Sequence, residues 1–206
     1  MTIWFASGNI HKKKELAAIL SSNGIRCELK SPAEAGLNFD PKETGNSFLE
    51  NALIKAGELY RLFEKQQPDG YSSGDPIIAD DSGICVDALE GRPGIHSARY
   101  CGQGKLSDTR LSDTGRNTLL LTELGNNTQR SARFICAMVL YRDPNCFFAA
   151  QDTMEGVLVE NAESARGSGG HGYDPILIIP SLGRTVAELS DEEKNQHSHR
   201  GKAEKQ

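Results

Sequence analysis

The chain has 206 residues, of which 37% are hydrophobic, 6% aromatic and 25% charged. At roughly 100–200 residues per domain, this length fits one large domain or two small lobes that share a core. The composition is typical of a folded globular protein, and no apolar run approaches the roughly 18 residues of a membrane-spanning helix. The 28 acidic and 23 basic residues give a net charge of −5, which argues against a nucleic-acid-binding protein.

The cysteines and the first residues bear on the cellular compartment. The five cysteines are odd in number and have no C-x-x-C spacing, so we expect free thiols in a reducing cytoplasm. The stretch from Met1 to Phe5 lacks the basic segment and long apolar run of a signal peptide, which also favours a cytoplasmic protein. We expect no membrane partner.

The first half of the chain alternates strand-like and helix-like patterns. Asn9 is a predicted N-cap for a helix that carries Leu16, Ile19 and Leu20 on one face and closes at Gly24. A second helix shows an apolar stripe of Phe48, Ala52, Ala56 and Leu59, with Asn51 and Lys55 on another face. The elements expected in order are a strand at 2–7, the first helix, a strand at 26–29, a loop at 31–46, the second helix at 47–63, a loop at 66–75 and a strand at 76–79 that continues extended at 84–86.

The second half changes to a strand-like period after a helix expected across 108–124. Apolar runs at 133–141, 147–150 and 154–159 predict adjacent antiparallel strands, and 176–179 predicts another strand. A last helix is expected from Ser190, because Ser190 and Glu193 form a capping box. The order indicates a mixed α/β fold with an open sheet and a second lobe.

The first candidate site is the turn of Ser7, Gly8 and Asn9 with Lys12 in the following helix. Glycine allows close approach of a ligand to the backbone, and the N–H groups of a helix start favour phosphate. Lys12 adds a positive charge. An ordinary β–α turn with solvated lysines remains the alternative, and no Walker A or G-x-G-x-x-G motif is present.

The second candidate site lies around Glu43, where carboxylates flank a helix start. A magnesium site prefers such hard oxygen ligands. The alternative is structural: Asn46 or Ser47 caps the helix and Glu50 supplies a favourable first-turn charge.

The third candidate is the pair Asp80 and Asp81 at the end of an apolar strand, followed by Ser82 and Gly83. Adjacent carboxylates there are costly unless they are solvated, paired or metal-bound. Because strand side chains alternate, one carboxylate can serve a cleft while the other anchors the structure. The alternative is a plain turn.

Two further segments near the C-terminus are rich in ligand-binding residue types. Glycines at 167, 169, 170 and 172 lie around His171 and Tyr173, whose planar side chains could stack on a base. The alternative is that this glycine-rich segment is a flexible loop. Lys194, His199 and Arg200 can bind an anion or a base, although a solvated polar helix is equally typical of this pattern. The histidines here lack recognisable zinc spacing.

Taken together in one order, these motifs resemble the inosine/xanthosine triphosphate pyrophosphatase family, which acts on non-standard purine nucleoside triphosphates. The resemblance extends from residue 2 to about 203, and we therefore expect a single pyrophosphatase domain across 1–206. The matching segments are Ser7-Gly8-Asn9 with Lys12 and Glu15, Glu43-Thr44-Gly45, Glu50-Asn51-Ala52 with Lys55, Ala79-Asp80-Asp81-Ser82-Gly83, Val86-Asp87-Ala88-Leu89, Ser97-Ala98-Arg99-Tyr100, Gly172-Tyr173-Asp174-Pro175, Glu193-Lys194-Asn195 and Ser198-His199-Arg200-Gly201.

The resemblance implies an elongated α/β fold, with a mixed sheet, flanking helices and two lobes around a central substrate cleft. It implies magnesium-dependent hydrolysis of ITP, dITP and XTP to monophosphate and pyrophosphate by a homodimer. Asp81 matches the proton acceptor and a magnesium ligand, and Glu43 matches a second metal-binding acid. The remaining matches are substrate-contacting positions, namely Ser7, Gly8, Asn9, Lys12, Ser82, His171, Gly172, Tyr173, Asp174, Lys194, His199 and Arg200.

Three departures accompany the resemblance. The family usually has Phe at the position of His171 and Thr at the position of Ser7, and many relatives carry an acid at Lys42.

Two alternatives remain. A related pyrophosphatase would act on other modified nucleotides, including pyrimidine derivatives. A catalytically silent nucleotide-binding protein is the alternative outside the enzymes, although intact Asp80, Asp81, Lys12 and Lys194 argue against it.

Overall fold

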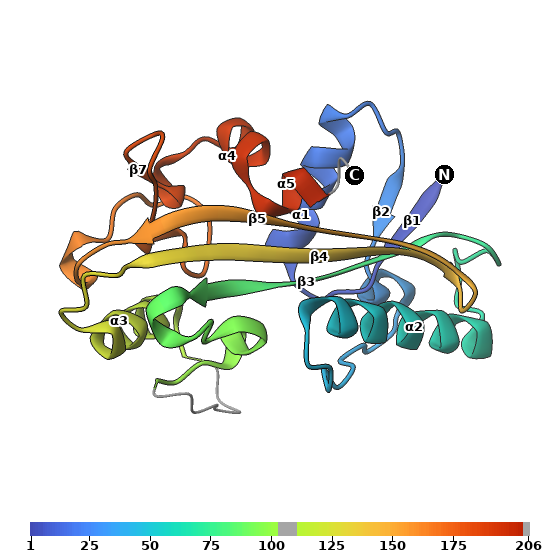
Figure 1. Ribbon diagram of the computed structural model, residues 1–206. Coiled ribbons are helices and arrows are strands. Elements are labelled where there is room, and N and C mark those ends of the chain that lie inside the picture. Colours follow the sequence, from blue (N-terminus) through green and yellow to red (C-terminus); the bar gives the residue numbers. More distant parts are fainter. Residues whose placement is uncertain (103–110, 204–206) are drawn as a thin grey trace. The chain divides into compact units, whose positions relative to one another are not determined.

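The structure is a computed structural model that describes residues 1–102 and 111–203 (Figure 1). Its strands and helices combine in a mixed α/β fold, as the sequence predicts. In chain order they are β1 (Thr2–Phe5), α1 (Ile10–Ser22), β2 (Glu28–Lys30), α2 (Phe48–Gln66), β3 (Ile77–Val86), α3 (Asp113–Leu124), β4 (Ser131–Asp143), β5 (Cys146–Leu158), β6 (Leu177–Ile179), β7 (Arg184–Thr185), α4 (Asp191–His197) and α5 (His199–Ala203).

The strands of the described residues form one mixed seven-stranded sheet in the order β2-β1-β3-β4-β5-β6-β7. Strand β1 is parallel to β2 and to β3, whereas β6 is antiparallel to both β5 and β7. Helices α1 and α2 provide the crossovers that parallel neighbours require. Strands β4 and β5 are joined by Pro144 and Asn145 alone, a connection that suits antiparallel neighbours.

The chain divides into two compact units. The first unit comprises 1–81, 136–152 and 200–206, and the second comprises 82–135 and 153–199. Strands β3, β4 and β5 therefore contribute residues to both units. No helix within the described residues is both long and apolar enough to cross a membrane.

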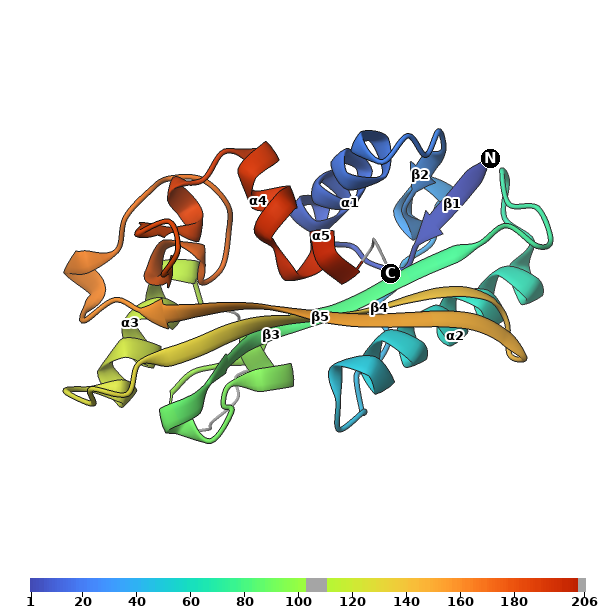
Figure 2. The ribbon, with the colours of Figure 1, turned by 45° about the horizontal axis from the view of Figure 1, so that its top comes forward.

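In the first unit, alternation along β1 determines which helix each side chain contacts. Trp4 and Ala6 pack in one apolar cluster with residues of α2, while Ile3 and Phe5 pack in another with Leu16 of α1. Figure 2 shows α1 and α2 on opposite faces of this part of the sheet. Neighbouring side chains of a strand in this unit are thus directed to different helices.

The second unit has its own apolar core. Leu120, Leu121 and Leu124 of α3 pack with Phe134 of β4 and Leu158 of β5. Helix α3 confirms most of the helix expected across 108–124, of which 108–110 lie outside the described residues. This core supports the glycine-rich segment that precedes β6, because Tyr173 belongs to the same cluster.

Helix starts follow the sequence closely. The Asn9 side chain accepts hydrogen bonds from the N–H groups of His11 and Lys12, and Ser47 caps α2. Ser190 and Glu193 form the predicted capping box of α4. These local signals are sufficient because a cap and its partner lie within one turn.

Two strand predictions differ from the structure. Strand β3 continues through Asp80, Asp81, Ser82 and Gly83, which the sequence placed at a strand end. Strand β5 is one strand across the expected runs at 147–150 and 154–159. Polar residues interrupt the apolar pattern in both places, but in β3 buried ion pairs compensate for them, as described below.

Candidate active site

The turn after β1 holds the predicted phosphate-binding residues in an ordered arrangement. The Asn9 N–H donates to Ser7 Oγ at 3.1 Å, and the Asn9 carboxamide in turn caps α1. A Cβ atom added at Gly8 would meet no heavy atom within 4 Å, so this backbone is open on its outer side. The turn lies at the start of α1, a helix of 13 residues, where the backbone dipoles favour an anion.

Lys12 and Arg200 converge on Asp80 in the first unit. Lys12 Nζ lies 3.1 Å from Asp80 Oδ2, and the Arg200 Nη2 lies 2.8 Å from the same oxygen. Arg200 also donates to Glu15 of α1 through Nη1. The Asp80 side chain is fully buried, so this carboxylate is a structural anion that holds α1 and α5 to β3.

Asp81 points to the opposite face of β3 and binds residues of α2. Lys55 Nζ lies 2.9 Å from Asp81 Oδ1, and Asn51 Nδ2 donates to Asp81 Oδ2 at 3.2 Å. The same ammonium lies 3.0 Å from Glu43 Oε1. Lys55 therefore bridges the two carboxylates that the sequence assigned to metal binding.

The loop that carries Glu43 is held by Asn51. The Gly45 N–H donates to Asn51 Oδ1 at 2.9 Å, so the Asn51 carboxamide joins this loop to Asp81. A Cβ at Gly45 would lie 2.6 Å from the Glu50 Cβ, which shows how closely the loop passes α2. The contact fixes the position of Glu43 relative to α2.

The two neighbouring carboxylates differ in basicity. Burial favours the neutral form of Asp80, but Lys12 and Arg200 outweigh it and hold the Asp80 pKa well below its ordinary value. Burial raises the pKa of Asp81, and Lys55 offsets this only in part. Burial also opposes the charge of Lys55, yet Asp81, Asp80 and Glu43 together raise the Lys55 pKa. Asp81 is thus the more basic carboxylate.

The donor set of Glu43 and Asp81 fits a magnesium ion that shares its coordination with a substrate. Mg²⁺ is commonly bound through one or two carboxylates, with substrate phosphates and water filling the other positions. The described residues hold no group of three or more His, Cys, Asp or Glu side chains arranged for a metal. Within the described residues, the two carboxylates are joined by Lys55 and belong to no larger group of metal-binding side chains.

In the second unit, the segment from His171 to Asp174 is tightly hydrogen-bonded. The Asp174 carboxylate accepts from the His171 N–H at 2.8 Å and from Lys194 Nζ at 2.8 Å. Tyr173 is buried, and its hydroxyl donates to the Ser97 carbonyl at 2.8 Å. The structure thus brings His171, Gly172, Tyr173, Asp174 and Lys194 close together.

The other predicted residues here are Ser82 and His199 of the second unit and Arg200 of the first unit. His199 is buried and stacks on Phe134, with ring centroids 5.1 Å apart and planes 17° from parallel. Ser82 is half-buried within β3. Arg200 follows His199 in the sequence but belongs to the ion-pair group around Asp80.

Sequence reasoning did not assign site roles to Asn51, Lys55, Glu15, Asp113 or Asn117. Helical spacing did reveal that Asn51 and Lys55 share a face of α2, but not that this face is buried. A polar i, i+4 pair beside an apolar stripe is a weak signal for such burial. The roles of Asp113 and Asn117 in α3 carry no local signal, because their partner lies more than 50 residues away.

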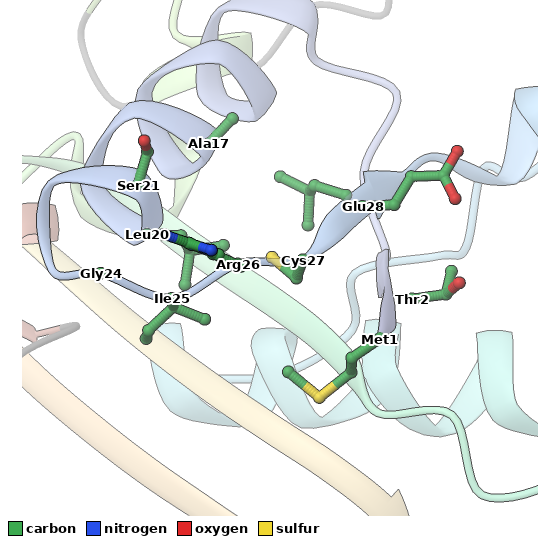
Figure 3. Close-up of a pocket in the computed structure, with 11 residues that line it drawn as sticks. Met1, Thr2, Ala17, Leu20, Ser21, Gly24, Ile25, Arg26, Cys27 and Glu28 are labelled. Carbon is green, nitrogen blue, oxygen red and sulfur yellow. The ribbon is translucent and has the colours of Figure 1, made fainter.

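A surface hollow of the first unit lies at the C-terminal end of α1. It is lined by Met1 and Thr2, by Ala17 and Leu20 of α1, and by Arg26 and Cys27 before β2 (Figure 3). None of the predicted site residues lines it. We therefore locate the candidate site at the carboxylate and lysine groups rather than in this hollow.

Comparisons with known proteins identify the family of this chain. The model of the Ham1 family matches residues 3–206. A dITP/XTP pyrophosphatase of Treponema denticola is 45% identical over 203 residues, which are 98% of this chain and 94% of that protein. One from Geobacillus kaustophilus is 41% identical over 203 residues, 98% of this chain and 89% of that protein.

A solved structure gives the same result for the fold. The structure of the Staphylococcus aureus Ham1 protein matches with a TM-score of 0.77 and 34% sequence identity, and the match covers 100% of this chain and 95% of that chain. Sequence and fold thus agree over almost the whole length. The chain belongs to the Ham1 family.

Proposed function

We propose that this protein hydrolyses non-standard purine nucleoside triphosphates, including ITP, dITP and XTP, to the monophosphate and pyrophosphate. Relatives that are 41–45% identical over nearly the whole chain are dITP/XTP pyrophosphatases. The observation that carries the proposal is that the two adjacent carboxylates of β3 have different surroundings. Asp80 is a structural anion held in ion pairs. Asp81 is the more basic carboxylate and lies beside Lys55, which also contacts Glu43.

The triphosphate chemistry belongs to the first unit in this proposal. Glu43 and Asp81 would hold Mg²⁺, which when bound neutralises charge on the phosphates and polarises the reacting phosphoryl group. Lys12 and Lys55 supply fixed positive charge, and Ser7, Gly8 and Asn9 supply the turn at the start of α1. These groups favour the charge that develops as the anhydride bond breaks.

Asp81 is also the residue that we assign to proton transfer. A water oxygen attacks the α-phosphorus, its proton passes to Asp81, and the bond to the bridging oxygen breaks to release pyrophosphate. In the protein without metal, burial raises the pKa of Asp81, so its carboxylate is more basic than that of an exposed aspartate. Asp80 is unsuited to this role, because its ion pairs hold its pKa low.

Base recognition belongs to residues of the second unit. Backbone and side-chain donors come from the segment from His171 to Asp174 and from Ser82, Lys194 and His199. A donor that binds the 6-keto oxygen of inosine or xanthine would remain unpaired against the 6-amino group of adenine, which penalises ATP. Arg200 would reach substrate only by sharing the hydrogen bonds that it makes with Asp80 and Glu15.

Assembly and compartment follow from the family resemblance and the cysteines. We assign a homodimer, and light scattering of the purified protein measures it. We assign a reducing compartment such as the cytoplasm, because the five cysteines are odd in number and have no C-x-x-C spacing.

Product analysis tests the proposed function. Purified protein is incubated with ITP, XTP, GTP, ATP and dTTP, with and without Mg²⁺, and the products are separated by ion-exchange chromatography. We expect monophosphate and pyrophosphate from ITP and XTP, only with the metal, and far slower turnover of ATP and GTP. Asp81→Asn purified in parallel controls for contaminating phosphatases, and Asp69→Asn, at an exposed loop residue, is the matched active control.

The other outcomes distinguish the alternatives. Turnover of dTTP in preference to ITP would indicate a pyrophosphatase for other nucleotides. Binding of ITP without turnover of any triphosphate would indicate a nucleotide-binding protein and would contradict the proposal.

A further inference from the structure

Two side chains of α3 hold the backbone of Gly172 from both sides. Asp113 Oδ2 accepts a hydrogen bond from the Gly172 N–H at 2.6 Å. Asn117 Nδ2 donates a hydrogen bond to the Gly172 carbonyl at 3.1 Å. Residues four apart on a helix lie on the same face, so Asp113 and Asn117 can both reach the one glycine.

The two bonds fix the peptide groups on either side of a residue with unusual backbone conformation. Gly172 has a φ of +67°, in the left-handed region that favours glycine. A Cβ there would meet nothing within 4 Å, so the positive φ, rather than a lack of space, favours glycine at this position. The hydrogen bonds from α3 hold the N–H and the carbonyl of Gly172 in this conformation.

Asn117 is buried in a way that carries a free-energy cost. The residue is 6% exposed, and its Oδ1 has no hydrogen-bond partner in the described part of the chain. An unpaired buried polar atom destabilises the fold, because it has lost its hydrogen bonds to water. An apolar residue would avoid this cost, but it could not bind the Gly172 carbonyl.

The segment around Gly172 contains the residues to which the proposed function gives base recognition. Its remaining contacts also restrain it, through Tyr173 to Ser97 and through Asp174 to Lys194. Removal of the α3 contacts would leave Gly172 free to rotate between these restrained residues. The His171 side chain and the adjacent backbone N–H groups would then lose their fixed direction.

We propose that Asp113 and Asn117 are positioning residues for substrate discrimination. They act through Gly172 and hold the 171–174 segment in the one conformation in which its donors fit a 6-keto purine. Preorganised donors discriminate best when a second layer of contacts fixes them. This inference rests on the proposed function, because it concerns the same substrate.

The test combines hydrogen exchange with kinetics. Asn117→Ala removes the bond to the Gly172 carbonyl, whereas Asp113→Ala removes the bond to the Gly172 N–H together with the ion pair to Arg116. Asp113→Asn keeps an acceptor for the Gly172 N–H and should behave like the wild type. Thr118→Ala changes an exposed residue of the same helix and is the matched control. The Asp113 side chain is 48% exposed, so Asp113→Ala should fold even if Asn117→Ala does not.

We expect faster amide exchange in the peptide covering 171–174 for the two alanine variants and not for Thr118→Ala or Asp113→Asn. The ratio of kcat/KM for ITP over ATP should fall at least about fivefold, mainly through a higher KM for ITP. Unchanged exchange, or changed exchange with an unchanged ratio, would overturn the inference. Failure of the wild-type protein to prefer ITP over ATP would instead overturn the proposed function, and the discrimination role with it.

Discussion

Asp80 and Asp81 are adjacent in β3, yet their carboxylates bind different helices on opposite faces of the strand. Asp80 pairs with Lys12 of α1 and Arg200 of α5, whereas Asp81 pairs with Lys55 of α2. The two-residue period of a strand produces this separation directly. One carboxylate can therefore stabilise the fold while its neighbour remains available for chemistry.

Asp81→Asn should nearly abolish turnover without unfolding the protein. The amide cannot accept a proton and is a weaker metal ligand, so we expect kcat for ITP to fall by about 100- to 10,000-fold. Steady-state kinetics measure the loss, and circular dichroism checks the fold. Turnover at the wild-type rate would remove Asp81 from the mechanism.

Glu43→Gln should raise the Mg²⁺ concentration that gives half-maximal rate. One of two candidate carboxylate ligands is lost, and an increase of at least about tenfold is expected. A magnesium titration of the ITP reaction measures it. Glu58→Gln, on the solvent side of α2 and paired with Arg61, is the control. An identical titration curve for the two variants would show that Glu43 is not a ligand.

Asp80→Asn should lower stability at neutral pH more than at acid pH. The folded-state pKa of Asp80 is depressed, so its stabilisation is complete above the ordinary aspartate pKa of about 3.9 and is lost as the pH falls toward the folded-state value. Removing one partner of a buried ion-pair group costs about 3–5 kcal/mol. Urea unfolding should show that the difference in free energy of unfolding between wild type and Asp80→Asn is smaller at pH 3.5 than at pH 7. An equal difference at both pH values would contradict the assignment of Asp80 as a buried, ion-paired carboxylate.

His171→Phe should retain activity. Phenylalanine keeps the planar ring that would stack on a base, so kcat/KM for ITP should stay within about tenfold of wild type. The variant also removes a titratable imidazole, and comparison of the two pH–rate profiles shows whether that group contributes. A loss greater than tenfold would count against a simple stacking role.

Cys136 should be unreactive in the folded protein. Burial, with Asp80 second, raises the pKa of the Cys136 thiol to about 12, and only the thiolate is a strong nucleophile. At pH 8 iodoacetamide should label the exposed Cys146 at least about 100-fold faster than Cys136. Mass spectrometry of the labelled peptides measures this ratio. Equal labelling of both thiols before unfolding would show that Cys136 is not buried.

The sequence predicted best what a few neighbouring residues decide. The cap at Asn9, the buried face of Leu16, Ile19 and Leu20, and the capping box at Ser190 are all local, and the structure confirms them. The α/β class followed from the order of such elements. The same reasoning placed Asp80 and Asp81 on opposite sides of a strand, which their partners in the structure confirm.

The sequence could not predict features that depend on distant partners. Continuation of β3 through Asp80 and Asp81 requires the compensating charges of Lys12, Lys55 and Arg200, up to 120 residues away. Burial of Lys55 depends on Glu43 and Asp81 in the same way. No local pattern of hydrophobicity contains this information.

The pairing of Arg200 with Asp80 and Glu15 has a consequence for biosynthesis. Glu15 and Arg200 are separated by 185 positions, and the first unit draws residues from the beginning, the middle and the end of the chain. While the ribosome still covers Arg200, neither Glu15 nor Asp80 can pair with its guanidinium. The apolar clusters of the first unit lie within residues 3–141, so they are synthesised before that of the second unit, which extends to Leu189. The first unit therefore has its apolar residues first and completes the ion pairs around Asp80 only after Arg200 has left the ribosome.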